Sequence, residues 1–205
     1  MLKIWGRVNS VNVKKALWCL EELKLPYQRV DAGMQFGVVD TPEYRRLNPN
    51  GLVPTIDDDG FVLWESHTIV RYLSMKHGRG TLWPADDRTW AEASKWMDWA
   101  FTFLASMRPV FWNLVRTPPE KRDMAAVEDG RKKCAQLAGM LDAALSGRRY
   151  VAGDGFTMGD IPVGCHMHLW LRLPLERPRH PNLEGWFARL LERPAYRKIV
   201  DIAIS

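Results

Sequence analysis

The chain has 205 residues, of which 46% are hydrophobic and 26% are charged, and it carries a net charge of +5. This composition excludes a disordered chain, and no apolar run reaches the roughly 18 residues that a membrane span requires. The basic residues are spread among 24 carboxylates instead of forming a block interleaved with aromatic residues, so a nucleic-acid partner is not expected.

Three cysteines, Cys19, Cys134 and Cys165, lie far apart and show no C-x-x-C spacing. Their odd number and separation predict neither a disulfide framework nor a metal site. The first residues enter a strand-like segment directly, without the apolar stretch of a secretory signal. We therefore expect a cytoplasmic protein without a bound metal.

The first 80 or so residues carry alternating strand and helix signals. Strands are predicted at 2–5 and 27–30, separated by an amphipathic helix. Thr41 followed by Pro42 resembles an N-cap with a first-turn proline, and it predicts a brief helix through Leu47.

A hairpin and a third helix follow. Strands are predicted at 53–56 and 61–64, on either side of the acidic turn 57–60, which is the strongest hairpin signal in the chain. Apolar residues within 69–73 lie on one face of a helix that closes at Gly78. The predicted order of this part is β-α-β-α-β-β-α.

After Gly80 only helical patterns remain. A long helix is predicted from Asp87 with a kink at Pro109, and Pro162 lies unusually deep in a later helix. The other helices are expected to follow four signals: the capping-box pattern Thr117–Glu120, the similar cap Thr157–Asp160, Pro181 and Pro194. Gly, Pro and Asp cluster over 78–87, so we expect two domains, 1–79 and 87–205.

Ser10 and Asn12 come just after the first strand, at the start of the first helix. A hydroxyl and an amide at the positive end of a helix dipole favour a bound thiolate or carboxylate. The alternative is that Asn9 or Ser10 simply caps the helix, and this segment alone favours that interpretation.

Val53 and Pro54 lie between a turn and a strand, which is a place for a cis peptide bond. A cis proline there exposes the preceding backbone N–H and C=O groups, which can then bind a peptide backbone. An ordinary edge-strand proline is the commoner alternative.

Glu65 and Ser66 end the second hairpin strand. Ser66 is expected to be the N-cap of the next helix, with its hydroxyl and the first free N–H groups available to a ligand carboxylate. Glu65 can meet a ligand ammonium, so the pair suits a zwitterionic end group. The alternative is a plain cap beside a buried or solvated glutamate.

These three sites, in this order and on this β-α-β-α-β-β-α pattern, resemble the glutathione S-transferase family over almost the whole chain. Residues 48–54 and 65–66 look like its glutathione site. Residues 150–160 are similar to its N-capping box, and residues 180–195 to its C-terminal motif. The resemblance implies a thioredoxin-like α/β N-terminal domain, an all-α C-terminal helical domain and, usually, a homodimer.

The resemblance also suggests how the thiol is activated. Ser10 matches the thiol-activating serine of theta-like classes, and Asn12 matches an asparagine near the thiol in some bacterial, nu-like classes. No tyrosine precedes Tyr27, which is a departure from the tyrosine-type classes. Cys19 lies two to three helical turns past Ser10, so it is expected to be a core residue.

The same resemblance implies glutathione as the co-substrate and assigns residues to its other parts. Val53, before Pro54, would bind the cysteinyl backbone, and Glu65 and Ser66 would bind the γ-glutamyl end. The glycine end has no clear counterpart, and Gln35 is the residue chosen for it.

The implied reaction is attack of the glutathione thiolate on a small electrophile. Ser10 would donate a hydrogen bond that helps to lower the thiol pKa from about 8.5. The electrophile is expected between Ser10 and the long kinked helix, against four of its side chains: Phe103, Met107, Phe111 and Arg116. Two alternatives stay open: a glutathione-dependent disulfide reductase or peroxidase, and a non-catalytic ligand-binding module.

Overall fold

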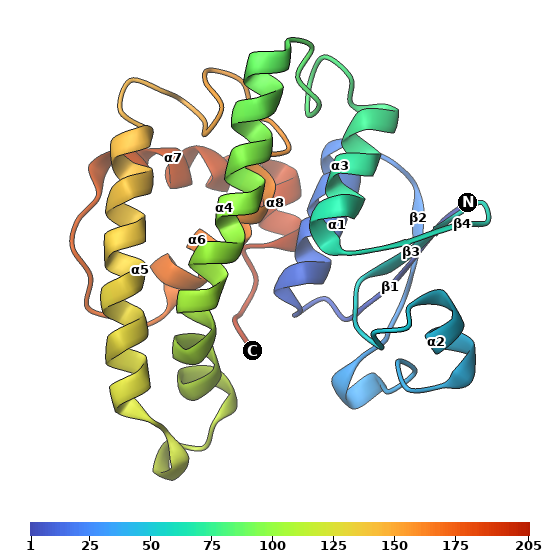
Figure 1. The fold of residues 1–205 in the computed structure, drawn as a ribbon, viewed down its shortest axis with the longest axis horizontal. Helices are drawn as coiled ribbons and strands as arrows, with labels where there is room; N and C mark the ends of the chain where they lie inside the picture. Colours follow the sequence, from blue (N-terminus) through green and yellow to red (C-terminus); the bar gives the residue numbers. More distant parts are fainter. The chain divides into compact units, whose positions relative to one another are not determined.

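A computed structural model describes residues 1–205 and separates the chain into two compact units, Met1–Trp83 and Pro84–Ser205 (Figure 1). The first unit contains all four strands together with three helices, and the second is built of helices alone. The expected α/β N-terminal part and all-α C-terminal part are therefore confirmed. No helix combines the length and the apolar character that crossing a membrane requires.

The sheet has the strand order β2-β1-β3-β4. Its strands are β1 (Leu2–Trp5), β2 (Tyr27–Val30), β3 (Thr55–Asp58) and β4 (Phe61–Trp64). β1 runs parallel to β2 and antiparallel to β3, and β3 runs antiparallel to β4. A parallel neighbour needs a crossover, which the first helix supplies, whereas β3 and β4 join through a tight turn.

The β3 strand starts at Thr55, two residues later than predicted. Pro54 has no N–H to give to a strand ladder, so Thr55 is the first residue to pair with β1. The turn is correspondingly shorter than the predicted 57–60, because the first two aspartates belong to β3. Asp59 and Gly60, with φ of 51° and 94°, form a two-residue turn of the kind that suits a hairpin.

Helices cover the sheet on both faces. The helices of this unit are α1 (Val11–Glu22), α2 (Pro42–Leu47) and α3 (Ser66–His77). α1 packs against α3 on one side of the sheet, and α2 lies on the other side (Figure 1). Because side chains alternate along a strand, Ile4 is buried on the α1–α3 side while Trp5 packs with Tyr44 of α2.

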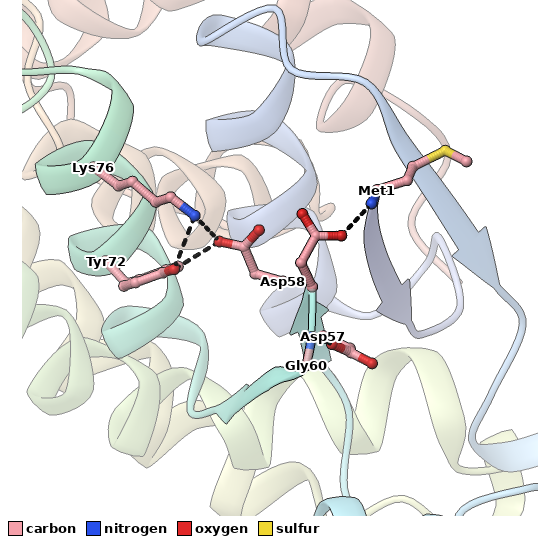
Figure 2. Close-up of polar contacts among 7 residues, drawn as sticks. Met1, Asp57, Asp58, Gly60, Tyr72 and Lys76 are labelled. Carbon is pink, nitrogen blue, oxygen red and sulfur yellow. Dashed lines mark hydrogen bonds and ion pairs between the residues drawn. The ribbon is translucent and has the colours of Figure 1, made fainter.

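The hairpin between β3 and β4 is tied to its neighbours by two carboxylates (Figure 2). Asp58 Oδ2 accepts hydrogen bonds from Tyr72 Oη at 2.6 Å and from Lys76 Nζ at 2.5 Å, both on α3. Burial opposes ionisation of Asp58, but these two hydrogen bonds outweigh it and lower the pKa of the carboxyl group. Asp59 pairs with the amino group of Met1, so the turn also holds the residue that precedes β1.

The second unit is built around a long helix. Its helices are α4 (Asp87–Phe111), α5 (Met124–Ala144), α6 (Asp160–Arg172), α7 (Pro181–Leu191) and α8 (Pro194–Ile199). α4 packs against both α5 and α6, and α7 packs against α5, α6 and α8. Fully buried aromatic side chains such as Phe103, Trp170 and Trp186 fill the space between them.

The helix α4 continues past Pro109 to Phe111 and then widens into a π-helical turn, Trp112–Arg116. A proline removes one N–H from the helical ladder, and a π turn is a common way to accommodate such a gap. The side-chain amide of Asn113 donates to the Pro109 carbonyl at 2.9 Å.

The predicted capping box at 117–120 is wrong. These residues lead into a 3₁₀ turn, Pro119–Lys121, and α5 begins only at Met124. The N-cap is Asp123, whose Oδ1 accepts from the Ala126 N–H at 2.9 Å. Two consecutive prolines hold the residue before each of them in an extended conformation, which delays the helix.

Asp160 organises the start of α6 from inside the second unit. Its fully buried carboxylate accepts from the backbone N–H groups of Val151 at 3.0 Å and Thr157 at 2.9 Å, and from Trp186 Nε1 at 2.9 Å. Burial raises the pKa of Asp160 to about 6 despite these donors. Because α6 starts at Asp160, Pro162 falls in the first turn, where a missing N–H costs nothing.

The substitution Asp160→Ala should lower the free energy of unfolding by about 3 kcal/mol, because it leaves several buried donors without an acceptor. Urea denaturation followed by tryptophan fluorescence measures this loss. Asp154→Ala is the matched control, since Asp154 is an exposed carboxylate in the same loop, and its loss should stay within about 0.5 kcal/mol. Equal effects of the two substitutions would contradict the role of Asp160.

Comparison of the unsubstituted protein with Asp160→Ala also tests the raised pKa of Asp160. Asp160 takes up its proton near pH 6 when folded but near pH 4 when unfolded, so its contribution to stability is complete below pH 4 and is lost as the pH rises through 6. When the pH is lowered from 7 to 5, the free energy of unfolding of the unsubstituted protein should therefore rise by about 1 kcal/mol relative to that of Asp160→Ala.

Candidate functional site

The predicted glutathione-site residues of the first unit lie in loops at one end of the sheet, where the ends of the four strands are aligned. Trp5, the last residue of β1, pairs with Val30 at the end of β2 and with Thr55 at the start of β3. Thr55 in turn pairs with Trp64, the last residue of β4. Neighbouring strands lie about 4.8 Å apart, so this row of four residues brings four loops together.

Each of these loops carries predicted site residues. Ser10 and Asn12 follow β1, and Gln35 follows β2. Val53 precedes β3, and Glu65 follows β4. The hydrogen-bonding register of the sheet thus gathers residues that are up to 55 positions apart in the sequence.

Ser10 occupies the N-cap position of α1, but its hydroxyl makes no capping hydrogen bond. The residue is extended, with φ −81° and ψ 123°, and its carbonyl accepts from the Lys14 N–H at 2.9 Å. The first turn of α1 contains no carboxylate, so nothing on the helix itself neutralises the positive end of the dipole. The Ser10 hydroxyl is available to a ligand, and an anion is the ligand favoured there.

Asn12 lies in the same turn, and a contact with Lys15 orients its side chain. Its Oδ1 accepts a hydrogen bond from Lys15 Nζ at 3.0 Å. Lys15 is fully buried although it is a lysine, and its Nζ also lies 2.9 Å from Nε2 of His67 on α3. One buried lysine side chain therefore joins the starts of α1 and α3.

The peptide bond between Val53 and Pro54 is cis. Val53 comes before the first paired residue of β3, and its N–H and C=O take part in none of the chain's own backbone hydrogen bonds. Its backbone can therefore pair with an extended peptide that lies along this edge.

The loop before Val53 is held by Tyr44, which the sequence did not single out, and by Asn48, which the sequence placed in segment 48–54 without a role of its own. Tyr44 Oη donates to the Leu52 carbonyl at 2.6 Å and lies 2.8 Å from Thr55 Oγ1. Asn48 Nδ2 donates to the same carbonyl at 2.9 Å and to Thr55 Oγ1 at 3.1 Å. Burial raises the pKa of Tyr44, so its hydroxyl stays a donor.

The structural roles of Tyr44 and Asn48 were not predicted because they depend on the tertiary fold. Tyr44 reads as an apolar position of a short helix, and Asn48 reads as a turn residue next to a proline. Their position just before the Asn50-Gly51 turn was the only available signal.

Ser66 is the first residue of α3, one position later than the N-cap role predicted for it. The N-cap is Glu65, which has a left-handed backbone with φ 73°. This conformation turns the chain sharply enough for the helix to begin at the next residue. The Glu65 side chain is exposed and makes no capping hydrogen bond, while Ser66 is 5% exposed.

Gln35 is exposed in the 3₁₀ turn Met34–Phe36 that follows β2. Two glycines with positive φ, Gly33 and Gly37, flank this turn. The structure therefore places Gln35 at the same end of the sheet as the other predicted site residues, without giving it a fixed partner.

Two of the four residues predicted for the electrophile are core residues of the second unit. Phe103 and Met107 are both fully buried. The Phe103 ring packs against Trp170, and Met107 Sδ lies 3.9 Å from Cys134 Sγ. Both side chains pack within the second unit in this structure, and their contact with a ligand stays a prediction.

Phe111 and Arg116 differ from that pair, because both are partly exposed. The Arg116 guanidinium lies 5.7 Å from the centre of the Phe111 ring and donates to the Ser205 carbonyl at 2.6 Å. They form a small apolar and cationic surface where α4 ends in its π turn.

Cys19 is a core residue, as expected. It is fully buried in α1, its Sγ lies 3.7 Å from Ser74 Oγ, and burial raises the pKa of the thiol to about 12. A thiol with so high a pKa is no nucleophile at neutral pH. Nowhere in the chain are three or more His, Cys, Asp or Glu side chains placed to hold a metal ion.

Comparison with known proteins bears on this site. The family described as "Glutathione S-transferase, N-terminal domain" matches residues 9–75, and "Glutathione S-transferase, C-terminal domain" matches residues 94–194. Glutathione S-transferase GstB of Escherichia coli strain K12 is 45% identical over 208 residues, which covers 100% of both chains. This chain belongs to the glutathione S-transferase family. It is accordingly assigned to the transferase class of enzymes.

Two further members of the glutathione S-transferase family extend the comparison. The theta class glutathione S-transferase of Xanthomonas axonopodis pv. citri, solved with glutathione bound, is 45% identical with a TM-score of 0.96, covering 100% of this chain and 99% of that one. Glutathione S-transferase 3 of Zea mays is 30% identical, covering 97% of this chain and 93% of its own length. Both support the fold expected from the sequence.

In this glutathione S-transferase, Tyr44→Phe should lower the free energy of unfolding by about 1 kcal/mol and speed amide hydrogen exchange in residues 49–53. The reason is the loss of the tyrosine hydroxyl from the Leu52 carbonyl. Tyr27→Phe is the matched control, since Tyr27 Oη donates to Glu21 at 2.8 Å, away from this loop. Unchanged exchange in Tyr44→Phe would show that Asn48 alone holds the loop.

Proposed function

We propose that this chain binds glutathione along the sheet edge and activates its thiol at the start of α1. The observation that carries the proposal is the free Ser10 hydroxyl at an N-cap position, on a helix whose first turn has no carboxylate. A hydrogen bond to the thiolate, together with the helix terminus, favours the ionised form of the thiol. The bound glutathione in the Xanthomonas relative supports this proposal.

The remaining site residues are assigned to the other parts of glutathione. Val53 pairs its free backbone N–H and C=O with the cysteinyl residue, beside Pro54. Glu65 meets the γ-glutamyl ammonium, and Ser66 with the first N–H groups of α3 meets the carboxylate. Gln35 is assigned to the glycine end.

The reaction is nucleophilic substitution or addition by sulfur. The thiol gives up its proton, a sulfur–carbon bond forms at the electrophilic carbon, and the leaving group or the opened ring takes the displaced electron pair. Ser10 acts as a hydrogen-bond donor throughout and not as a base. Phe111 and Arg116 are proposed to contact the electrophile, since both remain accessible.

The decisive measurement is an ultraviolet titration of the thiol of bound glutathione. Ser10→Ala should raise the thiol pKa by on the order of one unit and lower kcat/KM at neutral pH by about tenfold. Ser74→Ala is the matched control, because it removes a serine hydroxyl from the same unit at a buried position next to Cys19.

Two results would count against the assignment. If the chain does not bind glutathione, the proposed function is wrong. If it binds glutathione but Ser10→Ala titrates like the unsubstituted protein, activation comes from Asn12 or from the helix terminus instead.

A panel of substrates separates this proposal from the glutathione-dependent reductase or peroxidase. The transferase proposal expects turnover of organic halides and epoxides with formation of a thioether. Turnover of disulfides and peroxides alone would favour the reductase, and binding of glutathione without any turnover would favour a ligand-binding module.

We also propose that the protein is a cytoplasmic homodimer that does not bind nucleic acid. Three large apolar side chains of β4 and α3 are 37–50% exposed, namely Phe61, Trp64 and Met75, and a second copy of the chain would cover them. All three cysteines are buried and none is in a disulfide, which supports a reducing compartment.

Sedimentation should give about twice the 23.6 kDa mass of the chain, and Phe61→Asp should shift the protein towards the monomer. Met124→Asp changes an exposed methionine of the second unit and serves as the control. A monomeric unsubstituted protein would rule out the dimer.

A further inference from the structure

Lys15 is buried at a position where a lysine side chain is unusual. Its side chain is fully buried between α1 and α3, although a lysine is almost never fully buried without partners. Two of its contacts are Asn12 Oδ1 at 3.0 Å and His67 Nε2 at 2.9 Å. Both partners belong to the first turns of helices that begin at the proposed glutathione site.

The chemistry of these contacts fixes the orientation of Asn12. An ammonium group has three donors and no acceptor, so the amide atom that faces Lys15 must be the oxygen. The Asn12 Nδ2 group is then directed away from Lys15, and Asn12 is partly exposed while Lys15 is not. The amide therefore keeps its two Nδ2 hydrogens for a partner other than Lys15.

The contact with His67 works in the same way on α3. His67 is 2% exposed and directly follows Ser66. With Lys15 as an ammonium donor, Nε2 is the acceptor and the proton of the His67 ring lies on Nδ1. Lys15 therefore links the turn proposed to bind the thiol to the turn proposed to bind the γ-glutamyl carboxylate.

We propose that Lys15 is a positioning residue for thiol activation, which holds the Asn12 amide with its Nδ2 group turned towards the thiolate of bound glutathione. This inference rests on the proposed function and deepens it. It also assigns a role to Asn12, which acts as a second hydrogen-bond donor beside Ser10. The orientation of Asn12 is set by the buried Lys15.

The test is a double-mutant cycle on the thiol pKa of bound glutathione, using Lys15→Met, Asn12→Ala and the double variant. Lys15→Met should raise the thiol pKa by about half a unit to one unit. In the Asn12→Ala background the same substitution should have less than a third of that effect, because the amide that Lys15 orients is gone. A purely structural role would not produce this dependence on Asn12.

Lys14→Met is the matched control. Lys14 is also buried in α1, and its substitution removes the same charge from the same helix. Any shift that it causes should be the same with and without Asn12. Urea denaturation of every variant shows which ones are folded at the temperature of the titration.

A second variant keeps the test valid if Lys15→Met does not fold. His67→Phe keeps a ring in the space between α1 and α3 but removes the acceptor for Lys15. It should raise the thiol pKa in the same direction by a smaller amount, again only when Asn12 is present.

Three results would overturn the inference: no shift in the folded Lys15→Met or His67→Phe variant, no shift in Asn12→Ala, or an equal shift by Lys15→Met with and without Asn12. An equal shift would mean that the charge acts on the thiolate directly. Failure of the proposed function looks different, because glutathione would then not bind, or its thiol pKa would be unperturbed in the unsubstituted protein.

Discussion

The row of paired residues Val30, Trp5, Thr55 and Trp64 is the constraint on which the first unit depends. A slip of one residue in any pairing would exchange the two faces of a strand, moving Ile4 or Trp5 out of its core. The same slip would move a loop away from the common edge. Burial of apolar side chains and assembly of the candidate site are therefore secured by the same backbone hydrogen bonds.

Much of this arrangement could be predicted from local patterns. Apolar periodicity and the turn residues gave the strand and helix order, and Thr41 with Pro42 gave the start of α2, where Thr41 Oγ1 does accept from Tyr44 N–H. The position of Val53-Pro54 suggested a cis peptide bond, which the structure contains. These features are encoded within a few neighbouring residues, so sequence spacing alone is informative about them.

The rest depends on contacts between distant residues. Lys14 and Lys15 are of a residue type that is rarely buried, yet both are buried in α1, and Lys15 contacts His67 of α3. Phe103 and Met107 form an apolar stripe in the sequence, but only the packing of α5 and α6 against α4 makes both side chains fully buried. The start of α5 at Met124, after the N-cap Asp123, was missed because a capping pattern competes with two adjacent prolines.

Glu65 combines a carboxylate with a backbone conformation, φ 73°, that costs a residue with a side chain about 1–2 kcal/mol. Glycine would adopt the same turn without that cost, but it would bring no carboxylate to the edge of the sheet. Under the ligand contact proposed for Glu65, stability and ligand recognition therefore place opposite demands on this position. When variants are selected for stability alone, replacement of Glu65 is therefore favoured. Such a variant would keep its fold and lose the proposed ligand contact.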